Sequence, residues 1–87
     1  MLCLIKDIMN ENSVIIDDLI DMKILPRAGR VFTVTLTSRE ATFFFDTTII
    51  NDPEKFIDFL DQLDFKVSRV LNVQELEKEY SLYNWEY

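Results

Sequence analysis

Residues 41–65, ATFFFDTTIINDPEKFIDFLDQLDF, change from a strand pattern to a helix pattern, and this change decides the fold. Residues 41–50 are rich in aromatic and β-branched side chains, which is typical of a β-strand. Asp52 and Pro53 then supply a helix N-cap and a first helical residue. The stretch therefore predicts a strand followed by an amphipathic helix over about 53–65. The apolar face of that helix consists of Phe56, Phe59, Leu60 and Leu63.

The predicted strand has a partner immediately before it in the sequence. Residues 30–37 alternate between apolar side chains and mostly threonine side chains, as in a half-buried strand. The apolar side consists of Phe32, Val34 and Leu36. Residues 38–39 supply a short turn, so we expect an antiparallel hairpin over about 30–50. Helices or a third strand must cover one of its faces, because an isolated hairpin is only marginally stable in water.

The flanking segments predict further elements. Asn72 and Glu75 have the spacing of an N-cap and N3 pair, which predicts a second helix over about 73–84. At the N-terminus, the spacing of Leu2, Ile5, Ile8 and Met9 predicts a helix over 2–10. Residues 13–25 are compatible with a helix capped by Ser13 or with a strand, which the β-branched run at 14–16 indicates. The order helix, hairpin, helix, helix is typical of a small α+β domain.

Length and composition restrict the class of protein. The 87 residues suffice for a single small domain, 1–87, with one hydrophobic core. No apolar run approaches the roughly 20 residues that cross a bilayer, and the opening MLCLI lacks the basic leader and cleavage site of a signal peptide. The lone Cys3 lies among apolar residues and is interpreted as a small buried hydrophobe in a reduced compartment. We therefore expect a cytoplasmic location.

The residue types needed for common catalytic chemistry are missing. The chain has no histidine, which removes the usual general base, the Ser-His and Cys-His nucleophile pairs and the commonest zinc ligand. Its single glycine excludes the Gly-rich phosphate-binding loops. We therefore expect a binding protein and not an enzyme, with no catalytic residues, no cofactor and no metal site.

The negative charge is concentrated in one part of the chain. The formal net charge is −7, and residues 40–64 carry seven acids against the single base Lys55. Such a field repels nucleic acid and attracts basic surfaces. One interpretation is a row of carboxylates that imitates a phosphate backbone, and the other is a solvated helix face with no partner. The candidate partner-binding acids are Glu40, Asp46, Glu54, Asp58, Asp61 and Asp64.

The last seven residues, SLYNWEY, gather Tyr83, Trp85 and Tyr87. They either fold back to seal the open face of the hairpin, or they serve as aromatic anchors at an interface, where such residues are enriched. We include all three among the candidate partner-binding residues.

From Val34 onward the sequence resembles small, mostly uncharacterised proteins of bacteriophages and prophages. Those proteins carry a V-T-L strand, a short turn, an aromatic strand, a Pro-led acidic helix and a segment F-x-D-F-x-x-x-L-x-[FY] followed by S-R. The matching positions here are Val34, Thr35, Leu36, Pro53, Phe56, Asp58, Phe59, Leu63, Phe65, Ser68 and Arg69. The resemblance covers about half of the chain, and Lys66-Val67 depart from it where those proteins carry further acids. It implies no established activity.

By size, acidity and architecture the chain also resembles anti-CRISPR proteins, which are very small phage products that block a host nuclease. That resemblance implies a stoichiometric inhibitor that binds the basic surface of a CRISPR effector or another nuclease in the bacterial cytoplasm, as a nucleic-acid mimic. It implies no direct contact with nucleic acid or membrane. Two alternatives stay open. One is a homo-oligomeric or adaptor protein that uses its strand edge and C-terminal aromatics, and the other is an antitoxin or immunity protein. A monomer and a homodimer are both compatible with the sequence.

Overall fold

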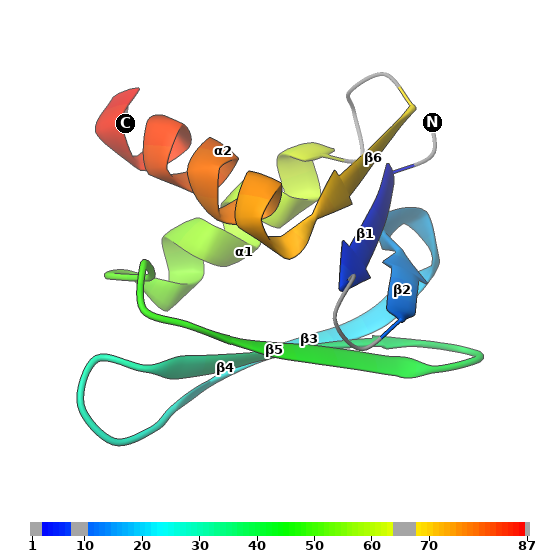
Figure 1. Cartoon of the computed structure of the whole chain (residues 1–87), viewed down its shortest axis with the longest axis horizontal. Helices are drawn as coiled ribbons and strands as arrows, with labels where there is room; N and C mark the ends of the chain where they lie inside the picture. Colours follow the sequence, from blue (N-terminus) through cyan, green and yellow to red (C-terminus); the bar gives the residue numbers. More distant parts are fainter. Residues whose placement is uncertain (1–2, 8–10, 64–67, 87) are drawn as a thin grey trace.

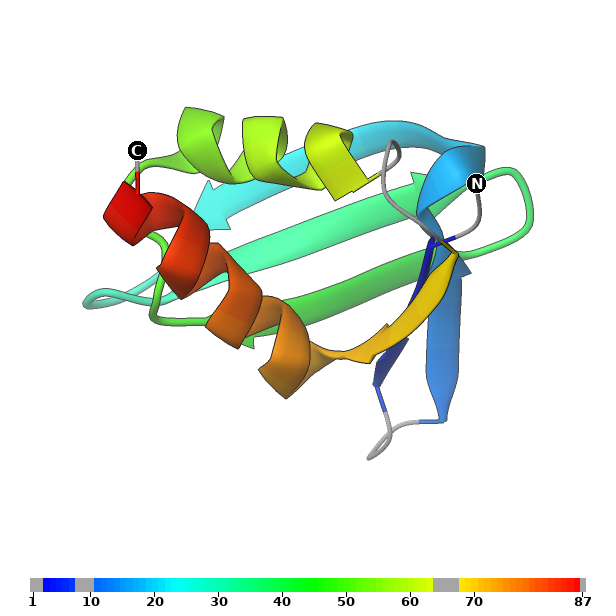
Figure 2. The same cartoon turned by 90° about the horizontal axis from the view of Figure 1, so that it is seen from above.

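The computed structural model describes residues 3–7, 11–63 and 68–86, and this part of the chain forms two three-stranded sheets and two α-helices. Both helices and the smaller sheet lie on the same side of the larger sheet (Figure 1). Figure 2 shows the two helices side by side across that face. The predicted α+β class is confirmed, although most strands precede the helices.

The larger sheet is antiparallel and has the strand order β3-β4-β5. Its strands are β3 (Leu19–Pro26), β4 (Phe32–Ser38) and β5 (Thr42–Thr47). The hairpin predicted over about 30–50 is therefore confirmed as β4 and β5. The support that such a hairpin needs comes from both expected sources, because β3 pairs along β4 and the helices cover one face.

The smaller sheet overturns one prediction. It consists of β1 (Cys3–Asp7), β2 (Asn12–Ile15) and β6 (Arg69–Asn72), with β1 central, antiparallel to β2 and parallel to β6. The helix predicted over 2–10 was wrong within the described residues 3–7. Cys3 and Ile5 are both buried and two residues apart, which is the period of a strand. The hydrogen bonds of β1 to strands on both of its sides stabilise the strand more than the spacing of apolar residues favours a helix.

The segment that the sequence left open, residues 13–25, is mostly strand. It contains the end of β2, one short 3₁₀ turn (Ile16–Asp18) and most of β3. Val14 and Ile16, from the β-branched run, are buried in the core. The strand interpretation of that run is therefore confirmed for Val14 and Ile15, whereas Ile16 begins the 3₁₀ turn.

Of the three predicted helices, the two in the C-terminal half are present, and both begin at the predicted cap. Helix α1 (Pro53–Leu63) begins after Asp52, whose Oδ1 accepts a hydrogen bond of 3.1 Å from the Glu54 amide. Helix α2 (Val73–Glu86) begins after Asn72, whose Oδ1 accepts one of 2.7 Å from the Glu75 amide. These bonds satisfy amides that have no partner inside the helix. Residues 64–65, the predicted end of the first helix, lie outside the described residues.

The core lies between the larger sheet and the layer that the helices and the smaller sheet form over it. The predicted apolar face of α1 is buried in full, and Tyr80 of α2 inserts against it. The Tyr80 ring centroid lies 4.9 Å from that of Phe56 and 5.5 Å from that of Phe59, both in edge-to-face geometry. Such pairs stabilise a fold beyond the area that they bury. Cys3 is buried here too, as predicted.

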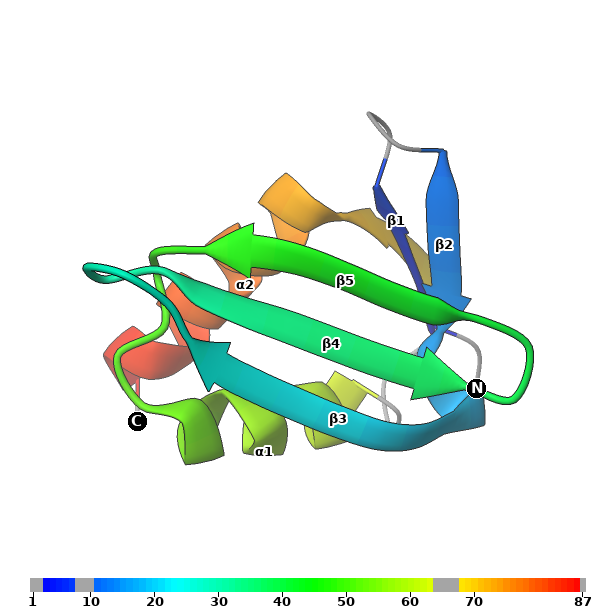
Figure 3. The ribbon, with the colours of Figure 1, turned by 90° about the horizontal axis from the view of Figure 1, so that it is seen from below.

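The opposite face of the larger sheet is turned to solvent (Figure 3). Strand alternation places the threonines of β4 on this face, with Val34 and Leu36 on the buried side. Exposed and buried residues alternate along β5, and the buried ones are Phe43, Phe45 and Thr47. Phe44 and Asp46 therefore point to the same outer face. The molecule thus has one covered and one open sheet face.

Candidate functional site

Three carboxylates occupy the solvent side of α1. Glu54, Asp58 and Asp61 are exposed, and the other side of the helix is buried against α2 and the sheet. We call these three residues the α1 acid row. At about 1.5 Å per residue the row rises in steps of roughly 6 and 4.5 Å. Helical periodicity over the predicted helix 53–65 places these three candidate acids on one side, opposite the apolar face. Asp64, the remaining candidate acid of that helix, lies outside the described residues.

The charge of the α1 acid row is not neutralised within the described part of the chain. The ion pairs found there join Lys23 to Asp21 and Arg69 to Glu79, and neither pair includes a residue of α1. Lys55, the one base on α1, reaches over to α2, where its Nζ donates to the Asn84 carbonyl at 3.4 Å. The row therefore presents a local negative field, in which like charges at i and i+4 cost a few tenths of a kcal/mol per pair.

Asp46 and Glu40 do not join this row. The alternation of exposed and buried residues along β5 places Asp46 on the outer face of the sheet, where its Oδ1 accepts a hydrogen bond of 2.6 Å from Thr33 Oγ1. Helix α1 covers the other face. Glu40 is exposed in the turn between β4 and β5. The structure thus brings together three of the six predicted acids, and it places Asp46 and Glu40 on other surfaces.

Glu40 instead borders an open hollow of about 640 Å³ between the two sheets. Asp17, Asp18 and Arg39 also line it. No local pattern indicates this hollow, because it forms where the β4–β5 turn approaches the 3₁₀ turn from a distant part of the sequence.

The C-terminal aromatics have separate positions. Tyr83 is half-buried, with its ring centroid 5.5 Å from that of Phe59, and its hydroxyl accepts a hydrogen bond from Gln62 Nε2 at 3.2 Å. Tyr83 therefore belongs to the packing between the helices. Trp85 is 89% exposed and Leu82, one turn earlier, is 60% exposed. Tyr87 lies outside the described residues.

A hydrogen bond from α2 helps to fix the start of α1. The Tyr80 hydroxyl donates to Asn51 Oδ1 at 3.2 Å, just before the Asp52 cap. Burial raises the pKa of this phenol, and the charges of Asp52 and Tyr83 raise it further. Tyr80 therefore stays neutral at physiological pH, and its bond to Asn51 and the Lys55 contact both join α2 to α1.

Within residues 3–7, 11–63 and 68–86, no group of three or more Asp, Glu or Cys side chains could hold a metal ion. None of the described helices is both long enough and apolar enough to span a membrane.

No family model matches the chain, and neither a curated protein nor a solved structure matches it. The resemblances drawn from the sequence therefore stay predictions. The candidate function rests on the surface described above.

Proposed function

We propose that this protein is an acidic inhibitor that binds the basic, nucleic-acid-binding surface of a host defence protein. The observation that carries the proposal is the uncompensated α1 acid row, Glu54, Asp58 and Asp61, on a helix fixed at its start and along its buried face. Basic surfaces that grip phosphates carry Lys and Arg groups with spare donors. Carboxylates at fixed positions suit such groups by charge and by hydrogen bonding.

The capped start and the buried apolar face of α1 support binding of this kind. Ordering of side chains and loops opposes association, so a preorganised surface loses less free energy when it binds. The steps of roughly 4.5 to 6 Å along the row are of the same order as the ~3.4 Å axial rise per phosphate of a DNA strand. The row would therefore occupy a groove that is built for a nucleic-acid backbone, and inhibition would be stoichiometric because nothing is cleaved.

The more specific form of the proposal is a phage-encoded anti-CRISPR protein that acts in the bacterial cytoplasm. Its supports are the resemblance of the segment from Val34 onward to phage proteins, the net charge of −7 and the small α+β fold. In this proposal the protein is not an enzyme, and its partner is a CRISPR effector or another nuclease. An antitoxin or immunity protein would use the same surface, and the identity of the partner separates these cases.

Affinity capture with matched variants tests the proposal. D58K/D61K reverses two charges of the row, and E11K/E75K reverses two exposed charges elsewhere. Each Glu or Asp to Lys change adds two charges, so both variants move the net charge from −7 to −3. Wild type and E11K/E75K should capture a nucleic-acid-binding protein from bacterial lysate at about 150 mM salt, and duplex DNA should release it. Equal capture by D58K/D61K, or capture that DNA does not compete, would contradict the proposal.

A second candidate is a homo-oligomeric or adaptor protein, and the exposed pair Leu82 and Trp85 favours it. The two side chains lie three residues apart on the outer side of α2, and large apolar side chains so exposed are typical of contact sites. Light scattering distinguishes the candidates. A dimer that persists in high salt and is lost in W85A would favour the adaptor, and a monomer of unchanged mass in W85A would count against it.

A further inference from the structure

A second surface, distinct from the α1 acid row, lies along the outer edge of β5. An open hollow of about 300 Å³ is lined there by residues of β1, β5 and the start of α2. We call it the β5 groove. Its lining residues are Asp7, Phe44, Phe45, Asp46 and Val73.

The hydrogen bonds of the sheet fix which backbone groups face this groove. The Ser38 amide donates to the Ala41 carbonyl at 2.9 Å, so these two residues form a hydrogen-bonded pair of the β4–β5 ladder. Such pairs recur at every second residue of an antiparallel ladder. The register then directs the N–H and C=O groups of Phe43 and Phe45 toward β4. Those of Phe44 and Asp46 point away from β4, into the groove.

The pairing of β4 with β3 supports the same assignment. The Arg27 amide donates to the Val31 carbonyl at 2.8 Å, which directs Val31, and by alternation Thr33 and Thr35, toward β3. The even-numbered residues of β4 therefore face β5, as the first bond requires. Among the described residues no strand pairs with the other side of β5, so Phe44 and Asp46 offer two N–H donors and two C=O acceptors.

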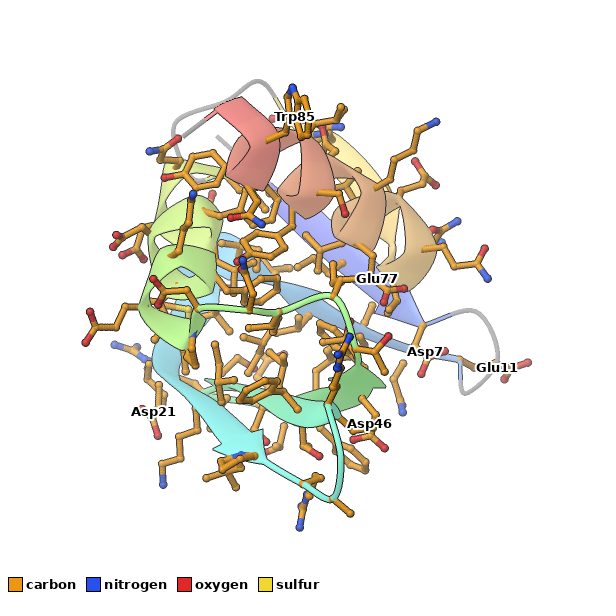
Figure 4. All side chains as sticks on the ribbon, turned by 90° about the vertical axis from the view of Figure 1, so that its left-hand side faces the viewer. Asp7, Glu11, Asp21, Asp46, Glu77 and Trp85 are labelled. Carbon is orange, nitrogen blue, oxygen red and sulfur yellow. The ribbon has the colours of Figure 1, made fainter. Side chains whose placement is uncertain are left out.

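The side chains at this edge favour a basic and partly apolar segment. Phe44 is 64% exposed on the outer sheet face, and Asp46 lies two residues further along the same face. Asp7 and Glu77 come close to the same edge (Figure 4), and Glu77 accepts a hydrogen bond of 2.7 Å from Thr47 Oγ1 at the end of β5. None of the residues that line the groove is basic.

We propose that the β5 edge receives an extended segment of a partner protein as a fourth, antiparallel strand. The segment places a Lys or Arg opposite Asp46 and, two residues later, an apolar side chain opposite Phe44. Backbone hydrogen bonds to Phe44 and Asp46 supply affinity, and the two outward side chains supply specificity, as in other cases of strand addition. Unprotected strand edges are the usual sites of such pairing.

A separate partner segment fits this edge better than a second copy of the chain. The start of α2 and the β1–β2 pair extend beyond β5 on the covered side of the sheet (Figure 3). A two-fold pairing of β5 with β5 would bring these elements of both copies together above the new strand pair. A short extended segment carries no such layer.

A seven-residue peptide, STKVFTS, tests the proposal, with its Lys and Phe placed opposite Asp46 and Phe44. We expect the largest amide NMR shifts at Phe44 and Asp46. N-methylation of the peptide Lys and Phe removes the two N–H donors that point toward β5 and should weaken binding at least tenfold. N-methylation of the Val between them should not, because its N–H points away from β5.

The charge of Asp46 is tested by a change in the protein. D46N keeps an acceptor for Thr33 but loses the charge, so it should weaken binding several-fold, and its matched control D58N should not.

Three results would overturn this inference: no shift at Phe44 and Asp46 at millimolar peptide, equal weakening by the two N-methylated peptides, or shifts confined to α1. The peptide test does not depend on the α1 acid row. D58K/D61K should bind the peptide like the wild type, so failure of one proposal leaves the other in place.

Discussion

Thr33 Oγ1 donates a hydrogen bond of 2.6 Å to Asp46 Oδ1, and this bond joins the middle strand of the larger sheet to its edge strand. Arg27 Nε donates to the same hydroxyl at 2.9 Å. The two bonds run from the loop after β3, over β4, to β5, and they set the position of the Asp46 carboxylate at the β5 groove. It also explains why Thr33 is buried although it points to the open side.

Replacement of Thr33 by valine tests this connection. The change leaves Arg27 Nε and Asp46 Oδ1 without their shared partner, so the free energy of unfolding should fall by about 1–2 kcal/mol. Urea denaturation measures the difference. Thr35→Val on the same face is the matched control, because Thr35 makes no side-chain hydrogen bond in the described part of the chain; it should change stability by less than about 0.5 kcal/mol. Equal effects of the two changes would show that the chain of bonds is not stabilising.

A second prediction concerns the aromatic contacts beneath α1. Phe59 is 2% exposed and its ring meets those of Tyr80 and Tyr83. Phe59→Ala should lower the free energy of unfolding by about 3–5 kcal/mol, a large share of the roughly 5–15 kcal/mol typical of a small domain. Phe44→Ala removes the same atoms from an exposed position. If urea unfolding shows a similar loss for both variants, the assignment of Phe59 to the core is wrong.

A third prediction follows from the Tyr80 phenol. Because folding raises its pKa above the ordinary value of about 10, the unfolded chain loses this proton first. The contribution to stability is complete below about pH 10 and is lost as the pH rises through the higher folded pKa. Urea unfolding at about pH 8 and pH 10.5 measures this loss. Tyr80→Phe should be less stable at the lower pH, where it lacks the bond to Asn51, and should show a smaller loss between the two pH values.

The acid row itself should have no role in folding. Asp58 and Asp61 touch no base in the described residues, and lysine is a better helix former than aspartate. D58K/D61K should therefore keep the melting temperature of the wild type or raise it slightly, since repulsion along the helix is relieved. Circular dichroism on heating provides the measurement. A clear drop in melting temperature would mean that the row has a structural function.

Local signals predicted much of the fold. The caps at Asp52 and Asn72 could be predicted because each depends only on residues next to it in the sequence. The strand over residues 30–37 could be predicted because one of its faces is buried, which produces a regular alternation of apolar and polar residues. The smaller sheet could not be found in this way. Its strand β6 has four residues, and it pairs with β1 across more than sixty positions of sequence, so no local period marks it.

For the candidate site, too, local sequence predicts some of the residues and only the tertiary structure places the others. Helical periodicity was enough to place Glu54, Asp58 and Asp61 in one row, because all three belong to one helix. The periodicity could not show that Asp46 faces the other side of the sheet, since that depends on which face of the hairpin the helices cover. The β5 groove combines β1, β5 and α2, and only the tertiary structure brings these elements together.

The most direct test of the proposed function is the affinity of the captured partner for three forms of the protein. Isothermal titration calorimetry at about 150 mM salt compares the wild type with D58K/D61K and E11K/E75K. These two variants have the same net charge. We expect E11K/E75K to bind within a few-fold of the wild type and D58K/D61K to bind at least tenfold more weakly, a difference of about 1.4 kcal/mol or more. Binding of D58K/D61K with the affinity of the wild type would contradict the account.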